Sequence, residues 1–458
     1  MSPLNSRGET LVSEPMPLLD SQGRLAKPGY ALSPLWAYDR DAITAAKHRI
    51  KEWDYYLVND GKYALALTLN DMSYLGMLSA SLLDLETGAY VTTTELTAFP
   101  MGKFGMPSSS DQGISFHETK RVSMRFSVGA QASPNSGEPA EVAEVEEAVE
   151  GGRTRLAGGA SIDLTSGLPD SPGRFDRKNC RQIEAVFRRF EGDDCLVARI
   201  WLDQPPQDSM VIATPWTQDE QAFYYNRKII GMRAQGVMAK GPEAEARRAV
   251  ERAAWAIHEA DAQLVDDRAG QADAGSRSVD EPGTGERVMI HRFLPEDSFG
   301  LLDWGRGVWT RDNTWYWSAA QGWQERDGRP CRFGFNLGYG FGDTSAASEN
   351  MVFVDGCAHK LGRVDFGIPE VAGADASAKR LSQRYDFMKP WHFTDDESRL
   401  DLRFVPLVDR CDLTDVKLVL TDQHQVFGTF SGHVILDDGT RMQIKDLKGF
   451  AEAVHNVY

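Results

Sequence analysis

One stretch of the sequence, LLDWGRGVWTRDNTWYWSAAQG from Leu301 to Gly322, places a carboxylate among several indole rings. It contains four of the chain's eleven tryptophans: Trp304, Trp309, Trp315 and Trp317. A carboxyl group among indoles loses hydration, which raises its pKa and prepares it to act as a general acid near neutral pH. Ring faces also stabilise a cation that develops during a reaction. The stretch therefore predicts acid-assisted chemistry on an apolar molecule, with Asp303 as the proton donor.

The same stretch is predicted to form a β-hairpin whose turn is RDN, residues 311–313, because these polar residues tolerate turn conformations. Mirror pairing about that turn places Trp309 opposite Trp315 and Asp303 opposite Gln321. The face predicted to line a ligand cavity carries Asp303, Trp309, Trp315 and Trp317, and the opposite face carries Trp304 and Arg306.

The alternative interpretation is that this hairpin is a packed wall of a barrel. Core packing accounts for most tryptophans in globular proteins. Asp303 would then pair with an arginine such as Arg306 or Arg363. Packing explains the carboxylate less well than it explains the rings.

Further candidate residues lie outside this stretch. Glu349 is the second predicted catalytic residue, although a hydrogen-bonded loop position is its simpler interpretation. Lys228, on an alternating segment, is predicted to lie at the surface. The residues predicted to bind substrate are those of the tryptophan stretch and of three further strands: Trp304, Arg306, Trp309, Trp315, Trp317, Tyr225, Asn226, Asn336 and Tyr339. Two carboxylates with tryptophan platforms also suit glycoside hydrolysis, so a carbohydrate-active enzyme that uses Asp303 and Glu349 is one alternative function.

The elements that must position these residues are predicted to be antiparallel β-strands. Most of the chain alternates with period two, in short runs separated by Gly, Asp, Asn and Pro. The pair Asp438-Gly439 joins two such runs and is typical of a type I′ hairpin turn, in which both central residues have positive φ. Helical spacing is confined to residues 39–53 and 243–265. The expected fold class is mainly β, with two lipocalin-like antiparallel barrel or sandwich lobes, a short N-terminal helix and a helical insertion.

Composition divides the chain into four parts. Two polar segments, residues 129–159 and 266–286, are rich in Gly, Pro and Glu and are typical of sequences that do not order themselves. The predicted parts are an N-terminal arm (1–28), an N-terminal β-barrel-like lobe (29–240, with the flexible insertion 129–159), a helical and flexible insertion (241–286) and a C-terminal β-barrel-like lobe (287–458).

Charge and motif content exclude several classes of function. A formal net charge of −17 repels phosphate backbones, so nucleic acid is not an expected partner. The five cysteines form no C-x-x-C pair and the nine histidines no H-E-x-x-H spacing, so neither a metal site nor a disulfide framework is expected. No dinucleotide fingerprint is present, and no cofactor is expected. The chain lacks long apolar runs and a signal peptide, so we expect a cytoplasmic protein that is not integral to a membrane.

The chain resembles the bacterial and fungal domain-of-unknown-function family 2804. The motifs that carry the resemblance are KEWDYYLV (Lys51–Val58), DSMVIATPW (Asp208–Trp216), FYYNRKI (Phe223–Ile229), LLDWGRGVW, FGFNLGYGFGD, SEN (Ser348–Asn350), HQVFGTFSG (His424–Gly432) and GFAE (Gly449–Glu452). The tryptophan-rich strands and the terminal Gly-x-x-Glu are more distantly similar to the carotenoid 1,2-hydratase group of lipocalin-like proteins. That resemblance implies two β-lobes with a cavity for an apolar ligand.

Together these observations predict an enzyme that hydrates, cyclises or isomerises an apolar or isoprenoid-like small molecule in a tryptophan-lined cavity. A lipid- or isoprenoid-binding protein without catalytic activity is the main alternative, since it would use the same cavity.

Overall fold

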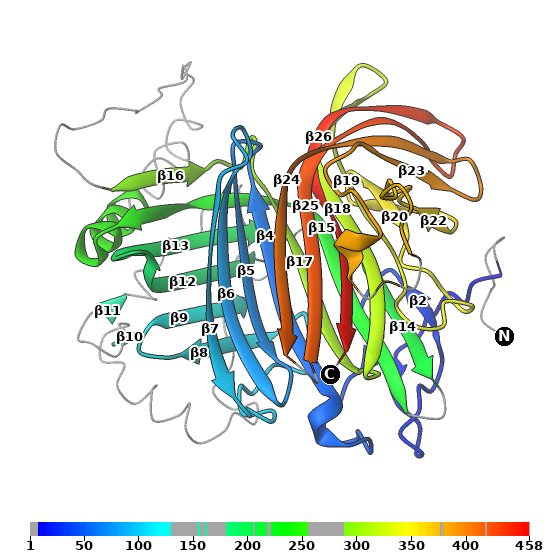
Figure 1. Cartoon of the computed structure of the whole chain (residues 1–458), viewed down its shortest axis with the longest axis horizontal. Helices are drawn as coiled ribbons and strands as arrows, with labels where there is room; N and C mark the ends of the chain where they lie inside the picture. Colours follow the sequence, from blue (N-terminus) through cyan, green and yellow to red (C-terminus); the bar gives the residue numbers. More distant parts are fainter. Residues whose placement is uncertain are drawn as a thin grey trace, which may run out of the picture.

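The computed structural model describes residues 8–129, 154–155, 161–162, 180–204, 207–217, 221–254, 288–375, 378, 380–416 and 419–457. Within these residues almost all regular structure is β-strand, arranged as two large antiparallel sheets (Figure 1). The prediction of a mainly β fold with two lobes is therefore confirmed. No helix in the described part of the chain is long and apolar enough to cross a membrane.

The first sheet has 13 strands and contains the N-terminal half of the chain together with two strands from beyond residue 287. Its central path runs β7-β6-β5-β4-β17-β15-β13-β12-β9-β8; β14 and β16 each pair with a different part of β15, and β2 pairs with β14. The strands are β2 (Gly29–Ala31), β4 (Ile50–Asn59), β5 (Tyr63–Asp71), β6 (Leu75–Asp84), β7 (Tyr90–Ala98), β8 (Gly113–Glu118), β9 (Val122–Val128), β12 (Cys180–Glu191), β13 (Asp194–Asp203), β14 (Met210–Thr217), β15 (Ala222–Gly241), β16 (Met289–Phe293) and β17 (Phe299–Val308).

The second sheet has nine strands in the order β21-β20-β19-β18-β26-β25-β24-β23-β22. The strands are β18 (Asp312–Arg326), β19 (Arg329–Tyr339), β20 (Met351–Val354), β21 (Cys357–Lys360), β22 (Val364–Asp365), β23 (Trp391–Asp395), β24 (Leu400–Val416), β25 (Val419–Ile435) and β26 (Arg441–Val457). Two short pairs lie apart: β1 (Met16–Pro17) with β3 (Trp36–Ala37), and β10 (Thr154–Arg155) with β11 (Ser161–Ile162). Within the described residues there are two 3₁₀ turns, η1 (Lys47–Arg49) and η2 (Leu381–Gln383).

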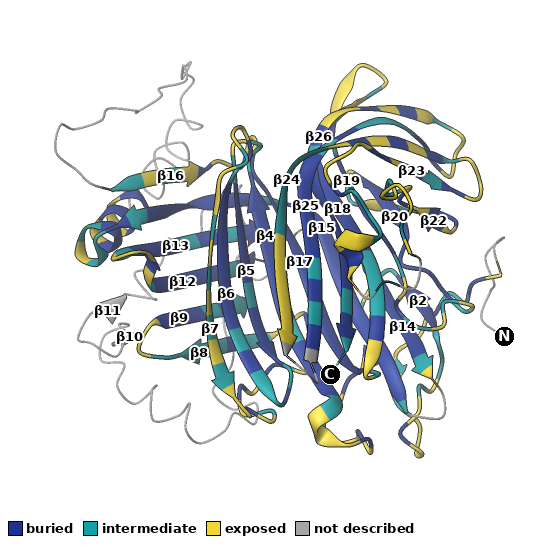
Figure 2. Ribbon diagram, viewed as in Figure 1, coloured by how far each residue is buried: buried dark blue, intermediate teal, exposed yellow. Residues whose placement is uncertain are grey.

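Three clusters of buried apolar side chains stabilise the two sheets and the contact between them. Each sheet has its own core, represented by Phe187 in the first and Phe404 in the second. A third cluster, which includes Phe427 and Leu301, takes residues from both sheets and lies between them. Because side chains alternate across a strand, the central strands bury both faces, one in a sheet's own core and one in the third cluster (Figure 2).

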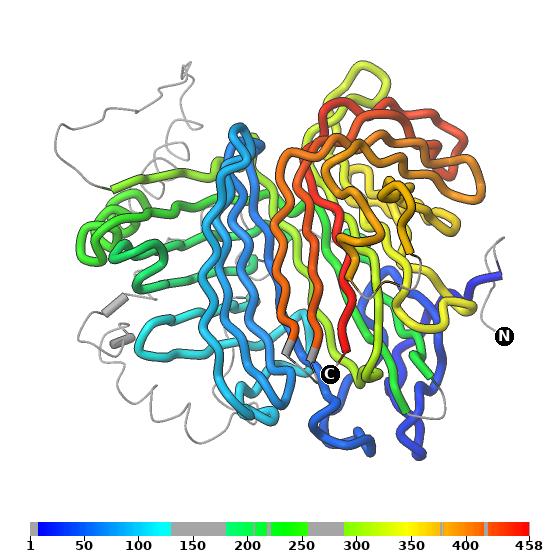
Figure 3. Tube along the Cα trace, in the orientation of Figure 1, coloured from blue at the N-terminus to red at the C-terminus, as the bar shows by residue number. Residues whose placement is uncertain are grey.

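The sheets also meet along a second line. In Figure 3 the blue strands β4 to β7 of the first sheet lie next to the orange strands β24 and β25 of the second. The Arg410 guanidinium of β24 donates a hydrogen bond to Ser81 Oγ of β6 at 2.9 Å. Segments far apart in the sequence therefore form one interface.

The predicted hairpin between residues 303 and 321 is wrong. Strand β17 lies between β15 and β4 in the first sheet, whereas β18 lies between β19 and β26 in the second. The chain crosses from one sheet to the other between Val308 and Asp312, so β16 and β17 belong to the first sheet although they follow residue 287. The division of the chain into independent domains stays a prediction.

The predicted helix over residues 39–53 is also wrong. Only η1 is helical there, and β4 begins at Ile50. The segment from Ile50 to Asn59 is rich in aromatic and branched side chains, and it pairs on both sides with β5 and β17, which overrides the helical spacing.

The second predicted helix is confirmed where it is described, over residues 243–254, and it packs on the first sheet through Ala246 and Val250. The rest of that prediction, to residue 265, lies outside the described residues. So do almost all of the predicted insertion 129–159 and the whole of the segment 266–286.

Candidate functional site

Two neighbouring strands of the first sheet, β15 and β17, present polar side chains toward the second sheet. Lys228 of β15 pairs in register with Asp303 of β17. Residues two apart point to the same side of a strand, so Asn226 and Tyr224 lie on the same face as Lys228. The second sheet covers this face, and its polar side chains complete a buried cluster.

Asp303 is buried and accepts hydrogen bonds from two side chains. Asn226 Nδ2 donates to Oδ1 at 2.6 Å, and Trp53 Nε1 of β4 donates to Oδ2 at 3.1 Å. Lys228 Nζ lies 3.9 Å from Oδ1. Among the described residues neither predicted partner, Arg306 or Arg363, pairs with Asp303: Arg306 points to the opposite face and pairs with Asp54, and Lys228 is the cation beside Asp303.

Glu349 meets the same lysine from the second half of the chain. Lys228 Nζ donates to Glu349 Oε2 at 2.9 Å and to Tyr224 Oη at 2.9 Å, while Tyr224 donates to the same Oε2 at 3.4 Å. The side chains of Lys228 and Glu349 are only 1% and 2% exposed. Lys228 is therefore not a surface residue as predicted, and one ammonium group lies between two carboxylates.

Burial shifts the pKa values of Glu349 and Tyr224. The pKa of Glu349 is raised above its usual value, first because the carboxyl group is desolvated and further because Asp303 is close; Lys228 opposes the shift. The pKa of Tyr224 is raised well above its usual value, again mainly by burial. Glu349 Oε1 is buried without a hydrogen-bond partner among the described residues. A protonated Glu349 can therefore donate from this oxygen.

A third carboxylate, Glu452 of β26, was not among the predicted site residues. It accepts hydrogen bonds from Trp315 Nε1 at 3.1 Å and from Gln425 Nε2 at 3.0 Å. Burial raises the pKa of Glu452, and the charge of Asp303 adds to the effect. The only sequence signal was its place in the Gly-x-x-Glu motif. In the described part of the chain, Lys228 is the only cation within 4 Å of any carboxylate in this cluster.

Aromatic rings from both sheets surround these carboxylates. Trp309 packs against Trp53, Trp216 and Trp315, with ring centroids 5.6, 5.3 and 4.9 Å away. Tyr224 stacks on Phe341 at 4.7 Å. Trp216 and Trp315 are half-buried at the edge of this cluster, and Trp315 bonds Glu452. Trp309 and Trp315 thus meet as predicted, but across two sheets.

Asn336 and Trp317 tie the second sheet to this cluster. Trp317 Nε1 donates to Asn336 Oδ1 at 2.8 Å, and Asn336 Nδ2 donates to the backbone oxygen of Glu349 at 2.9 Å. Lys228 Nζ lies 4.9 Å from the Trp317 ring centroid. These two predicted residues position Glu349 and the lysine.

Four predicted substrate-binding residues lie elsewhere. Trp304, Arg306 and Tyr225 point to the opposite face, into the core of the first sheet, where Trp304 packs edge to face on Tyr225 at 5.4 Å. Tyr339 stacks on Tyr316 at 4.5 Å beside the core of the second sheet. Alternation separates these residues from Asp303, and they are not part of the cluster.

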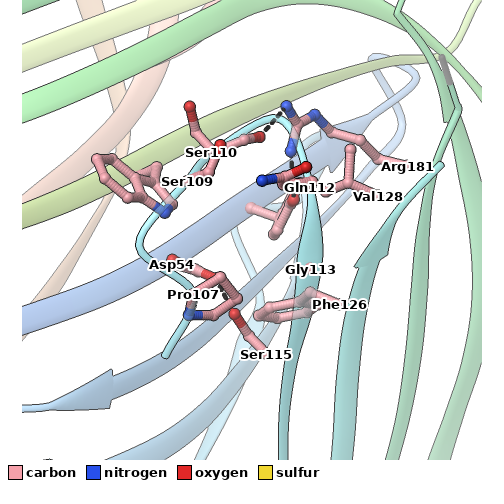
Figure 4. A pocket seen from close by; sticks show the side chains of 12 residues that line it. Asp54, Pro107, Ser109, Ser110, Gln112, Gly113, Ser115, Phe126, Val128 and Arg181 are labelled. Carbon is pink, nitrogen blue, oxygen red and sulfur yellow. Dashed lines mark hydrogen bonds between the residues drawn. The ribbon is translucent and has the colours of Figure 1, made fainter. Parts of the chain in front are cut away.

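The opposite face of β15 and β17 contains a pocket of its own. It lies beneath the segment between β7 and β8, next to Trp304, Asp54 and Arg181 (Figure 4). Arg306 is fully buried there and bonds Asp54 Oδ1 at 3.1 Å and the Pro107 oxygen at 2.9 Å. The sequence interpretation that Arg306 is separated from Asp303 is confirmed.

Comparison with known proteins gives a family and two solved structures. The family described as "Domain of unknown function (DUF2804)" matches residues 9–259 and 286–458. "Crystal structure of CghA with Sch210972" is 8% identical, covers 96% of this chain and 97% of that chain, and has a TM-score of 0.39. "Crystal structure of CghA" is 8% identical, covers 97% and 95%, and has a TM-score of 0.37. No curated protein matches the chain.

Proposed function

The chain belongs to the DUF2804 family, and we propose that it catalyses acid-assisted isomerisation, cyclisation or hydration of an apolar small molecule between its two sheets. The observation that carries this proposal is the buried group of three carboxylates, Asp303, Glu349 and Glu452, with one ammonium group among them. Buried carboxylates that outnumber their cations retain a proton near neutral pH, because they repel one another and lack water.

Glu349 is the proton donor in this proposal. Its Oε1 has no partner in the described part of the chain, whereas both oxygens of Asp303 accept hydrogen bonds from side-chain N–H groups. A proton from Glu349 Oε1 would add to a carbon–carbon double bond or to an oxygen of the substrate. The indole faces of Trp309 and Trp315 would stabilise the resulting cation.

Asp303 then accepts a proton from the cationic intermediate or from water. Lys228 lies between the two carboxylates and hydrogen-bonds Tyr224, so it offers a route by which the proton returns to Glu349. Isomerisation and cyclisation would need no other reactant, and hydration would need only water.

The same geometry disfavours a carbohydrate-active enzyme. In glycoside hydrolases the two carboxylates face each other across the scissile bond. Here Lys228 Nζ lies 2.9 Å from Glu349 and 3.9 Å from Asp303, in the space that a sugar ring would need.

The test compares the wild-type protein with Glu349→Gln, which keeps the shape of the side chain and removes its proton. Each purified protein is incubated with an organic extract of the source organism, and compounds consumed or formed are followed by mass spectrometry. We expect conversion by the wild type and a loss of at least about 100-fold in Glu349→Gln.

Glu325→Gln is the matched control, because Glu325 is exposed and lies at the end of β18 that is far from the cluster. Full conversion by Glu349→Gln would contradict the assignment of the proton donor. A compound that binds the wild type and is recovered unchanged would support the non-catalytic alternative.

A further inference from the structure

Strands β24 and β25 of the second sheet bring a carboxylate, a thiol and an imidazole together on one face. Asp409 and Cys411 are two residues apart on β24, so their side chains share a face, and Cys411 pairs in register with His424 of β25. One potential ligand atom from each of these residues lies within 4.8 Å of the other two. Among the described residues, no other group of three histidine, cysteine or acidic side chains has this spacing. No sequence motif contains the group, because its members lie on two strands.

The His424 ring is held between two carboxylates. Its Nδ1 lies 2.7 Å from Asp409 Oδ2, and its Nε2 lies 3.3 Å from Asp422 Oδ1. Asp422 is fixed in turn, because the backbone N–H of Leu381 donates to its Oδ2 at 2.6 Å. The imidazole also stacks on Phe387, with ring centroids 4.0 Å apart. Histidines that bind metal ions are commonly held in this way, with one ring nitrogen on the metal and the other donating to a carboxylate.

A hydrogen-bonded pair of Asp409 and His424 does not account for the whole arrangement. Such a pair uses only Oδ2 of Asp409, whereas Oδ1 is buried and has no hydrogen-bond partner in the described part of the chain. A buried carboxylate oxygen without a partner is unfavourable. The free thiol of Cys411 lies beside the same two side chains. A cation among the three side chains would engage all of them.

A metal ion fits here because it needs little room. In a tetrahedral zinc site, bonds of about 2.0–2.3 Å place the ligand atoms about 3.3–3.8 Å apart. The three ligand atoms already lie within 4.8 Å of one another, so small side-chain rotations bring them to that spacing. Cys411 is exposed, which gives an ion access from solvent and leaves a coordination position for water.

We propose that Asp409, Cys411 and His424 bind a zinc ion, with water as the fourth ligand. Thiolate, imidazole and carboxylate are the side-chain ligands of Zn²⁺, whereas Mg²⁺ prefers oxygen ligands alone. On binding, the ion replaces the protons on His424 Nδ1 and on the Cys411 sulfur, and both protons pass to solvent.

This site is separate from the carboxylate cluster between the sheets. Gln425, the next residue after His424, points to the opposite face of β25 and donates to Glu452. Val426, two residues after His424, belongs to the core of the second sheet. The zinc site therefore goes beyond the proposed function and does not depend on it.

The test titrates Zn²⁺ by calorimetry into the full-length protein after a chelator has removed bound metal. We expect saturable binding of one ion per chain, whereas Mg²⁺ titrated in the same way should show none. Co²⁺ gives a spectroscopic readout, because a thiolate bound to it produces a charge-transfer absorption in the near ultraviolet. This absorption should appear with the wild type and be absent with Cys411→Ser.

Cys411→Ser should weaken Zn²⁺ binding by more than about 100-fold, because even the outer hydrogen-bond partners of metal ligands contribute about 10–100-fold. Asp422→Asn, which alters the partner of His424 Nε2, should weaken binding by about 10–100-fold. Cys357→Ser is the matched control, since Cys357 is also an exposed free cysteine of the second sheet, and it should bind Zn²⁺ like the wild type.

Circular dichroism confirms that each variant folds. Equal Zn²⁺ affinity in Cys411→Ser and Cys357→Ser would overturn the proposal. So would Mg²⁺ binding as tight as Zn²⁺ binding, or no saturable Zn²⁺ binding to the wild type.

Discussion

Lys228 controls the electrostatics of the buried carboxylates, because it is the cation that Asp303 and Glu349 share. An ammonium group without water is stable only while these acceptors remain charged or hydrogen-bonded. Lys228, Asp303 and Glu349 are held by contacts with one another. Removal of one of them should therefore destabilise the protein through the other two.

We expect Lys228→Met to reduce the free energy of unfolding by about 3–5 kcal/mol, since it leaves buried carboxylates without their cation. Urea unfolding at pH 7 measures this change. The double variant Lys228→Met/Asp303→Asn should be more stable than Lys228→Met alone, because the carboxylate charge that Lys228 balances is then removed as well. Lys389→Met is the control, since Lys389 forms only a surface pair with Asp386. Purely additive losses in the double variant would contradict the coupling.

His424 of β25 predicts a pH dependence of stability outside the site. Burial alone would lower its pKa, but hydrogen bonds to Asp409 and Asp422 outweigh burial and raise the pKa to about 9. A raised pKa in the folded state stabilises the protein fully below about pH 6.5, and this contribution is lost as the pH rises through about 9. We expect the wild type to lose about 1–3 kcal/mol between these values.

His424→Gln should lose less stability than the wild type over the same range, although it is less stable at pH 6. Urea midpoints measured at intervals from pH 6 to pH 9.5 test this. His392→Gln is the control, because His392 is largely exposed. Parallel curves for His424→Gln and the wild type would show that another group causes the dependence.

The sequence identified part of the buried carboxylate cluster, but the prediction placed Lys228 at the surface and did not include Glu452. Asp303, Asn226 and Glu349 could be selected because polar side chains stand out in aromatic, alternating segments. Lys228 was misplaced because alternation separates the two faces of a strand but does not say which face a second sheet covers. Glu452 lies in the cluster only through pairing of β26 with β18, which no local pattern contains.

At the scale of elements, alternation along β15 and β17 creates two chemical environments. Lys228 and Asp303 face the second sheet, while Arg227 and Arg306 face the core of the first. The sequence predicted this separation for β17. It did not predict the strand's neighbours, because period two is the same whether a strand pairs with the next strand or with β4, about 250 residues away.

A turn sequence predicts a β-hairpin correctly only when the two strands beside it pair with each other. The hairpin at Asp438-Gly439 is confirmed, since β25 and β26 pair down to Ile435 and Arg441. Its turn type is wrong: of the two residues only Gly439 has a positive φ, because three residues, 437–439, connect the strands. The RDN turn predicted at residues 311–313 instead lies where the chain leaves the first sheet.

The glycine of β17 at position 305 allows β4 to place Trp53 over Asp303. A Cβ atom at Gly305 would lie 2.0 Å from Trp53 Cζ2, and Trp53 Nε1 donates to Asp303. We expect Gly305→Ala to reduce the free energy of unfolding by about 1–3 kcal/mol and to displace the indole. Urea unfolding measures the first effect, and the wavelength of tryptophan emission reports the second.

Gly322→Ala is the control for this prediction. A Cβ atom at Gly322 meets only the Leu447 side chain, at 3.1 Å, and a flexible side chain can move. Equal stability losses in the two variants would show that the close approach of Trp53 is not the cause.

For the whole molecule, composition and period two were sufficient to predict two β-lobes, because both lobes are built from alternating strands. They did not predict that β16 and β17 complete the first sheet after the long insertion. Long-range pairing depends on which edges remain free once other strands have paired, and this information is spread over the chain.

The cluster between the sheets predicts that the molecule unfolds as one unit. It contains Phe427 and Leu301 from the two sheets. Backbone groups cross the same boundary: Gly231 N donates to Gln321 Oε1 at 2.8 Å, and Thr214 Oγ1 donates to the Phe341 oxygen at 2.9 Å. Neither sheet can expose this face without exposing apolar surface on the other.

Chains of this size often unfold in several steps, so a single transition would be informative. Hydrogen exchange measured by mass spectrometry across a urea series compares peptides from β13 and β25, which lie in the cores of the first and second sheets. We expect both to lose protection at the same urea concentration.

Phe427→Ala should lower that concentration equally for both peptides, at a cost of about 3–5 kcal/mol. Phe404→Ala, in the core of the second sheet alone, should do the same, because each lobe depends on the other. Loss of protection in β25 while β13 remains protected would show instead that the two sheets are independent folding units.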